Sequence, residues 1–159
     1  MKKTLLCIML ALAMVFSIPV SAQTRDTHIK KEYQRYIYDI SEQYNVCPEL
    51  IMAIVEAESS GKADARNGGC IGLMQVYEKY HKDRMKRLGV TDLYDPYSNI
   101  LVGTDILMEL AERYGDLPLV LMKYNGSSDA VQRAESGNYT KYAEDIMKRS
   151  EELERIHGK

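Results

Sequence analysis

Glu58 is the residue of this sequence whose position points most directly to chemistry. It follows the apolar residues Ile51, Ile54 and Val55 by seven, four and three positions, and side chains at these offsets share one face of an α-helix. A carboxyl group on an apolar face is costly when it is ionised, so its pKa should rise, and a protonated carboxyl can act as a general acid near neutral pH. The alternative is that Glu58 lies just past the buried part of its helix, at a solvated end.

Cysteine and histidine give weaker signals. Cys47 and Cys70 flank the Glu58 segment, and in an exported chain they can form a disulfide or remain as two buried free thiols; the sequence leaves both alternatives open. The three histidines, His28, His81 and His157, are scattered and none has ligand spacing from a cysteine. No metal site is therefore predicted.

Helical periodicity dominates the rest of the chain, and no alternating strand pattern of useful length is present. Helices are predicted at 29–44, 48–60, 79–88, 95–115, 118–124 and 139–156, with a helical turn at 73–76. Pro48 suits a first helical turn, and Gly89 suits a helix end. A glycine-rich loop at 67–72 follows the Glu58 helix, and the last helix has a charged end that we expect to fray. The predicted fold class is all-α, in one globular domain.

The first 22 residues have the features of a secretory signal peptide. Lys2 and Lys3 precede an apolar run at 5–15, which is too short for a stable membrane span, and a small-residue cleavage site follows at 20–22. We therefore expect a mature domain at 23–159 without a membrane anchor, exported to the periplasm, the cell wall or the extracellular space.

Charge and aromatic content narrow the class of ligand. Removal of residues 1–22 would leave 19 basic and 23 acidic side chains, which is not the charge balance of a nucleic-acid-binding protein. The chain has 12 tyrosines, one phenylalanine and no tryptophan. Tyrosine can pack its ring on a sugar face and hydrogen-bond through its hydroxyl, or it can simply replace phenylalanine and tryptophan in a small core.

Three short segments are the strongest motif signal: Glu58-Ser59-Ser60, Gly72-Leu73-Met74-Gln75 and Tyr124-Asn125. In this order, in an exported helical chain, they resemble the catalytic domain of the soluble lytic transglycosylases. That resemblance implies a lysozyme-like fold related to goose-type lysozyme.

The resemblance covers roughly residues 33–147. The segment 93–96 with Asn99, Ile100 and Gly103 is similar to the start of a helix that the family shares, and 139–142 is similar to its late tyrosine motif. Each piece alone is weak, but together, at this spacing, they favour a catalytic Glu58 over a solvated helix end.

The resemblance implies a role for each matched residue of the first two segments. Glu58 is the single catalytic acid and base. Ser59 can hydrogen-bond the carboxylate or the sugar, or cap a helix end. Gln75 contacts substrate through its amide, or braces its loop. Met74 packs on a sugar face, or in the core.

The later motifs supply the other predicted substrate contacts. Tyr124 and Asn125 match the tyrosine–asparagine pair of the cleft, although a core tyrosine with a helix-ending asparagine is the alternative. Tyr142 matches a tyrosine whose hydroxyl lies near the acid.

Some residues depart from the family pattern. The pair Tyr124-Asn125 is followed by Gly126-Ser127 in place of the usual alanine and glycine, Arg66 stands where a serine is usual, and Cys70 where an alanine is usual. These changes bear on the preference for substrate, but not on the acid.

The implied reaction needs no cofactor. Glu58 would protonate the oxygen of the β-1,4 bond between N-acetylmuramic acid and N-acetylglucosamine, and then take the proton of the muramic C6 hydroxyl, so that a 1,6-anhydro ring closes. The substrate's acetamido group would replace the second carboxylate that most glycosidases use.

Three alternatives remain open. An acid that activates water, from among Asp64, Asp95 and Asp105, would make the chain a hydrolytic muramidase. Of these, Asp95 is expected to cap a helix, and Asp105 is expected to be solvated in the middle of one. A glycan-binding envelope protein without activity is the second. An accessory role, opening the wall for a secretion or conjugation machine, is the third, and it would leave the chemistry unchanged.

Overall fold

The computed structural model describes residues 27–159, so the predicted signal peptide at 1–22 lies outside the described residues. This part of the chain forms seven helices and a small sheet. The helices are α1 (Lys31–Tyr44), α2 (Pro48–Ser59), α3 (Glu78–Leu88), α4 (Pro96–Tyr114), α5 (Leu117–Tyr124), α6 (Ala130–Glu135) and α7 (Lys141–Ile156). The strands are β1 (Arg66–Asn67), β2 (Cys70–Ile71) and β3 (Val76–Tyr77).

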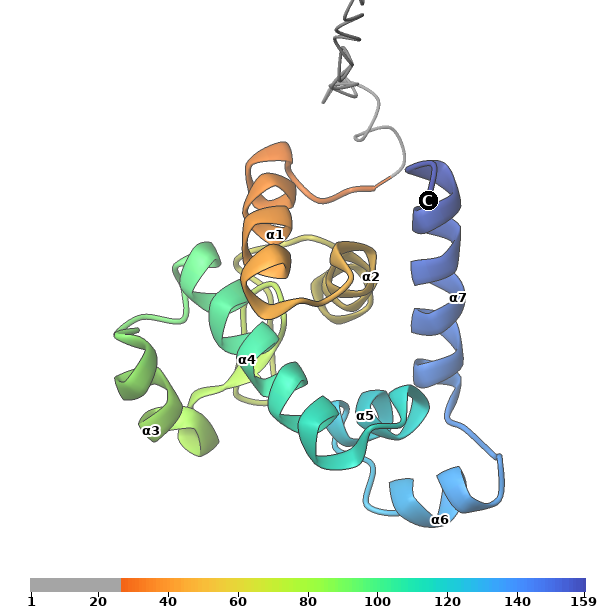
Figure 1. The fold of residues 1–159 in the computed structure, drawn as a ribbon. Coiled ribbons are helices and arrows are strands. Elements are labelled where there is room, and N and C mark those ends of the chain that lie inside the picture. The colour runs from red at the N-terminus through yellow and green to blue at the C-terminus, as the bar shows by residue number, and fades with distance from the viewer. Residues whose placement is uncertain (1–26) are drawn as a thin grey trace, which may run out of the picture.

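Helix α2 lies at the centre of the molecule, between α1 and α7 (Figure 1). It begins with Pro48 at its first turn, as predicted, and it ends where Ser60 takes a left-handed conformation with a φ of 53°. Ile51, Ile54 and Val55 are fully buried. The apolar stripe read from the sequence is therefore the core face of α2.

The sheet is a finding that the sequence did not predict. Its strands run antiparallel in the order β1-β2-β3, and each has two residues. Gly68 and Gly69 have φ values of 57° and 97°, which suit a tight turn between β1 and β2. Two-residue strands are too short to give an alternating pattern. The helical turn predicted at 73–76 is wrong at its end, because Val76 begins β3.

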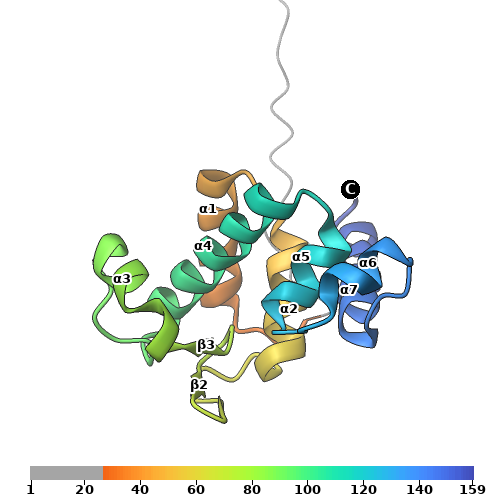
Figure 2. The ribbon, with the colours of Figure 1, turned by 90° about the horizontal axis from the view of Figure 1, so that it is seen from below.

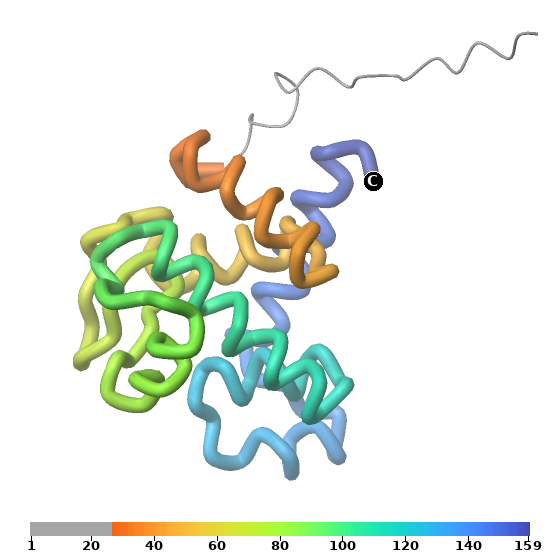
Figure 3. The backbone as a smooth tube through the Cα atoms, turned by 60° about the vertical axis from the view of Figure 1, so that its left-hand side comes forward, coloured from red at the N-terminus to blue at the C-terminus, as the bar shows by residue number. Residues whose placement is uncertain are grey.

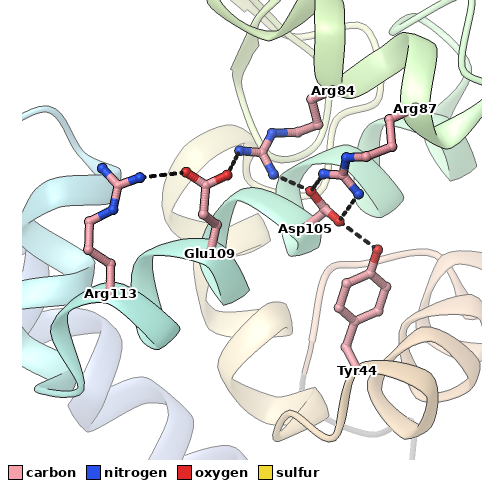
Figure 4. A network of polar contacts seen from close by, with 6 residues as sticks. All are labelled: Tyr44, Arg84, Arg87, Asp105, Glu109 and Arg113. Carbon is pink, nitrogen blue, oxygen red and sulfur yellow. Dashed lines mark hydrogen bonds and ion pairs between the residues drawn. The ribbon is translucent and has the colours of Figure 1, made fainter.

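Helices α3 and α4 are joined by a cluster of ion pairs around Asp105 (Figure 4). Arg84 bridges Asp105 and Glu109, Arg87 contacts Asp105 at 2.6 Å, and the hydroxyl of Tyr44 donates to Asp105 at 3.0 Å. Asp105 is 8% exposed, so the expectation that it is solvated is wrong. Although burial opposes the shift, the hydrogen bonds from Arg87, Arg84 and Tyr44 hold the pKa of Asp105 below its usual range.

The C-terminal end of α7 is held against the start of α2. Glu49 is fully buried, and its carboxylate contacts Nδ1 of His157 at 2.8 Å and Nζ of Lys159 at 2.8 Å. The end of the last helix is therefore held in place, and the expectation that it frays is wrong. Glu49 is a core residue, although the apolar stripe of α2 did not reveal it.

The remaining elements close the other sides of the molecule. Figure 2 shows β2 and β3 near one end of α2, and Figure 3 shows the sheet and α3 on one side with α6 on another. The short helix α6 was not predicted; it follows the break at 125–128 that the sequence indicated. No helix among residues 27–159 combines the length and the apolar character needed to cross a bilayer.

Candidate active site

Glu58 lies in the last turn of α2, at the edge of the core, and is half-buried. One of its carboxylate oxygens accepts a hydrogen bond of 2.5 Å from the hydroxyl of Tyr142 in α7. The position agrees with both parts of the sequence argument: the residue continues the apolar stripe, and it does so at the helix end. Its side chain is nevertheless not simply solvated there.

The pKa of Glu58 is raised. Burial of the carboxyl group is the cause, and the hydrogen bond from Tyr142 only partly offsets it, because that bond favours the ionised form. Burial raises the pKa of the Tyr142 and Tyr124 hydroxyls, and the charge of Glu58 adds to the rise, so both remain protonated donors at neutral pH. A carboxyl group in this setting can hold a proton and release it to a bound substrate.

Residues 72–75 form a turn beside Glu58, and Asn99 of α4 fixes it. The Asn99 side chain is fully buried; its amide oxygen accepts from the Met74 backbone N–H at 2.8 Å. Its amide nitrogen donates to the backbone carbonyls of Ile71 at 2.8 Å and Leu93 at 3.0 Å. A Cβ at Gly72 would lie 2.3 Å from that nitrogen, so only glycine allows this approach. From the sequence, Asn99 was noted only as part of the family resemblance. The structure shows that it holds the turn at 72–75 in place.

Ser59 and Gln75 use their polar groups to brace the same turn. The Ser59 hydroxyl lies within hydrogen-bonding distance of the Val55 carbonyl at 3.0 Å and the Leu73 carbonyl at 2.9 Å. The Gln75 amide nitrogen donates to the carbonyls of Ala65 at 3.2 Å and Gly72 at 2.9 Å. Ser59 is 7% exposed and joins α2 to the turn. Gln75 is half-exposed, and no hydrogen bond to its amide oxygen is found among the described residues.

Met74 is a core residue. It is fully buried, and its side chain packs so closely on α4 that a Cβ at Gly103 would lie 2.6 Å from its sulfur. Its backbone carbonyl accepts a hydrogen bond of 2.9 Å from the hydroxyl of Tyr124. Of the two alternatives for Met74, its full burial favours packing in the core, since a fully buried side chain has no surface to offer a ligand.

The two residues of the predicted pair, Tyr124 and Asn125, have different environments. Tyr124 is half-buried, and its hydroxyl bonds the turn at the Met74 carbonyl; burial raises the pKa of this hydroxyl, and the charges of Glu58 and Cys70 add to the rise. Asn125 is the C-cap residue of α5 and is exposed.

Cys47 and Cys70 are both free thiols, so the disulfide alternative is wrong. Cys47 precedes the first residue of α2, whereas Cys70 lies in β2 near Glu58, beyond its other end. A helix of 12 residues is about 18 Å long, and a disulfide allows about 7 Å between Cα atoms. The Cys47 thiol instead donates to the Glu49 carboxylate at 3.1 Å.

The acids considered as water activators have other positions. Asp105 is bound to arginines, as described above, and the Asp95 carboxylate caps α4 by accepting from the Ser98 backbone N–H at 2.8 Å, as predicted. Asp64 is exposed on the turn before β1. No other carboxylate is among the described groups that shift the pKa of Glu58. The described residues also contain no cluster of histidine, cysteine, aspartate or glutamate side chains able to hold a metal ion.

Comparison with solved structures defines the fold class. The structure resembles that of an inactive glutamate-to-glutamine mutant of the lytic transglycosylase Slt from Pseudomonas aeruginosa, with a TM-score of 0.67 and 19% sequence identity. The match covers 77% of this chain and 24% of that one. The predicted all-α, lysozyme-like fold is confirmed, with the addition of the small sheet.

The family follows from the sequence. Residues 35–147 match the model of the transglycosylase SLT domain, and the chain belongs to this family, as the resemblance indicated. A transglycosylase of Enterobacteria phage PRD1 is 40% identical over 110 residues, which are 68% of this chain and 39% of that protein. The membrane-bound lytic murein transglycosylase C of Serratia proteamaculans is 32% identical over 77% of this chain and 39% of its own length.

A third relative has a different kind of name. The invasion protein IagB of Salmonella typhimurium is 35% identical over 80 residues, which are 45% of this chain and 49% of that protein. The chain thus spans less than half the length of these three relatives.

Proposed function

We propose that this protein is a peptidoglycan lytic transglycosylase in which Glu58 is the only catalytic acid and base. The observation that supports this most directly is the half-buried Glu58 carboxyl, with a raised pKa and a single hydrogen-bond donor, Tyr142, facing it. Membership of the transglycosylase SLT domain family supports the substrate, a glycan strand of N-acetylmuramic acid and N-acetylglucosamine.

In the proposed reaction Glu58 takes part in two proton transfers, first as acid and then as base. Protonated Glu58 donates to the bridging oxygen of the β-1,4 bond, and the bond between that oxygen and the muramic C1 atom breaks. Glu58, now ionised, accepts the proton of the muramic C6 hydroxyl while the C6 oxygen bonds to C1. Glu58 ends protonated, no water is consumed, and the product carries a 1,6-anhydro ring.

A single carboxylate also favours this reaction over hydrolysis. An inverting glycosidase needs a second carboxylate about 6.5–9.5 Å away to activate water, and a retaining one needs a nucleophile about 5–5.5 Å away. No carboxylate is among the described groups that shift the pKa of Glu58, which supports a site with a single carboxylate. The substrate's acetamido group can take the place of the second carboxylate.

The substitution Glu58→Gln tests the acid. It keeps the shape and polarity of the side chain but removes the transferable proton. Clearing of a purified peptidoglycan suspension should fall by about three orders of magnitude or more, since general acid catalysis contributes 10²–10⁴-fold and the same residue acts twice. Glu56→Gln is the matched control, because that side chain contacts Arg149 in α7 and does not face Tyr142. A Glu58→Gln protein that still clears the suspension would refute the assignment.

The mass of the product separates the remaining alternatives. Digested muropeptides one water lighter than hydrolysed ones are expected, because the 1,6-anhydro ring closes without water. Hydrated reducing ends alone would favour a muramidase. Binding to peptidoglycan without any cleavage would favour a glycan-binding protein.

For the rest of the site we propose a division between binding and support. Gln75 and Asn125 offer free polar groups to sugar hydroxyls and N-acetyl groups, while Tyr142 and Tyr124 orient the acid and the turn beside it. Ser59 acts only through the backbone that it holds. Residues 23–159 would form a single catalytic domain with its core at 33–147.

We propose that the chain acts after export, in the periplasm, the cell wall or outside the cell, where peptidoglycan lies. Its similarity to a phage transglycosylase and to an invasion protein supports a local opening of the wall for a secretion or conjugation machine. A strain carrying Glu58→Gln should then lose transport by that machine while the machine's components remain present.

A further inference from the structure

The two faces of the small sheet are clearly distinct. In an antiparallel sheet, residues directly opposite one another carry their side chains on the same face. Ile71 is opposite Arg66 on one side and Val76 on the other, and both Ile71 and Val76 are buried, so this face is turned to the core. The opposite face carries Asn67, Cys70 and Tyr77, in a row across the three strands.

The middle of this row lies near the catalytic acid. Cys70, in the middle strand, is close enough to Glu58 and Tyr124 for their charges to interact. Tyr77 follows in β3, and its ring lies on the backbone of Gly69 in the neighbouring turn: a Cβ at position 69 would be 2.8 Å from the ring. Gly69 therefore leaves the space in which the Tyr77 ring is held.

The row continues into Tyr80, in the first turn of α3. The Tyr77 and Tyr80 rings are 4.9 Å apart between centroids and stand at 78° to each other, so together they form a corner. Tyr80 is 70% exposed, the most exposed large hydrophobic side chain among the described residues. An exposed ring that a second ring already orients loses little conformational freedom when it is covered, and so binds a flat apolar surface efficiently.

We propose that Asn67, Tyr77 and Tyr80 form an outlying subsite that binds a sugar ring of the glycan strand at a distance from the bond that is cleaved. The apolar face of a pyranose would stack on Tyr80, and the Asn67 amide would bond its hydroxyl or N-acetyl groups. The occupant is the glycan strand itself, because the row passes near Glu58 at Cys70 and a polymer seated on the acid continues past it. This proposal rests on the proposed function.

The experiment compares long and short substrates. Peptide-free glycan strands are separated by length, and kinetics are measured on long strands and on the shortest fragment that the unmodified chain cleaves. Tyr80→Ala should raise KM on long strands about three- to tenfold, the equivalent of one lost aromatic contact. It should leave kcat on long strands, and both constants on the short fragment, unchanged. Tyr80→Phe keeps the ring and should behave as the unmodified chain does.

The matched control is Tyr94→Ala. Tyr94 is 46% exposed, and its ring is covered by Arg66, which belongs to the core-facing side of the sheet. If Tyr80→Ala and Tyr94→Ala have the same KM on long strands, the subsite is refuted while the proposed function stands. If Tyr80→Ala raises KM equally on both substrates, the ring acts next to the cleaved bond, and the outlying position is wrong. An unmodified chain that cleaves no glycan refutes the proposed function, and this subsite with it.

Discussion

The hydroxyl of Tyr142 is the one hydrogen-bond donor to Glu58 among the described residues, so the state of the acid depends on it. Burial pushes the pKa of Glu58 up and Tyr142 pulls it down, and burial prevails. The proposed reaction requires both forms of this carboxyl in turn. A donor that moderates the pKa without ionising itself suits that requirement, because Tyr142 has a raised pKa of its own.

The substitution Tyr142→Phe should shift the pH dependence of activity. Loss of the donor removes the interaction that favours ionised Glu58, so the pKa of Glu58 rises further. Since the first step needs protonated Glu58, the alkaline limb of the kcat/KM profile should move to higher pH, even if the maximal rate falls. Rates of peptidoglycan cleavage across the pH range measure this. A limb that stays in place, or moves to lower pH, would contradict the role given to Tyr142.

At the scale of elements, the turn at 72–75 is shaped by contacts from three helices. Asn99 of α4 clamps its backbone, Ser59 of α2 lies against Leu73, and Tyr124 of α5 holds the carbonyl of Met74. None of these contacts is local in sequence, so the turn adopts its shape only when the helices are packed.

Asn99→Ala should therefore destabilise the fold and the site together. It leaves the Met74 N–H and two carbonyls buried without this partner, which costs about 3 kcal/mol or more. Denaturant titration gives the free energy of unfolding, and kcat should fall even where the protein remains folded. Asn138→Ala, at an exposed position, should change stability by less than about 0.5 kcal/mol. Equal effects of the two substitutions would show that Asn99 is not a clamp.

For the whole molecule, the contact between the start of α2 and the end of α7 determines stability in acid. Glu49 is the centre of this contact. Although burial opposes the shift, hydrogen bonds from Lys159, His157 and Cys47 lower its pKa from 4.5 to about 2. A carboxylate with a lowered pKa stabilises the fold above its unfolded pKa, and this stabilisation is lost as the pH falls through the folded value.

Glu49→Gln should cost about 3 kcal/mol at neutral pH, where the stabilisation from the carboxylate is complete. Between about pH 4.5 and pH 2 the difference from the unmodified chain should shrink, since the unmodified carboxyl becomes protonated as well. Denaturant midpoints at several pH values measure both effects. Glu151→Gln, at an exposed position of α7, is the control and should leave stability unchanged. A penalty that is the same at all pH values would contradict an electrostatic origin.

The sequence predicted burial correctly where an apolar pattern extends over more than one helical turn. It was misleading where a single polar side chain contacts a partner far away in the sequence. Glu58 was placed correctly because Ile51, Ile54 and Val55 define a face over two turns. Asp105 was misjudged and the burial of Glu49 was not foreseen, because their partners come from other helices and from the end of the chain. Asn99 could have been noticed by the argument used for Glu58, since apolar Val102 follows it by three positions and so shares its helix face.

The candidate site was predictable only as a set of residues. Glu58 and Tyr142 do come together; Gln75 lies on the turn beside them, and Tyr124 contacts that turn from α5. Which of their polar groups are already hydrogen-bonded within the protein depends on contacts between distant parts of the chain. Residue spacing in the sequence does not predict these contacts. The small sheet has strands too short for a pattern, and its outward face became visible only through strand pairing.

The 84 positions that separate Tyr142 from Glu58 have a consequence for how the protein is made. The acid lies in the second helix and its donor in the last, so a growing chain contains the Glu58 segment long before it contains α7. Synthesis or proteolysis that stops short of α7 yields a chain in which the acid has neither its donor nor the helix that covers α2. The proposed activity would thus be withheld until α7 has been made.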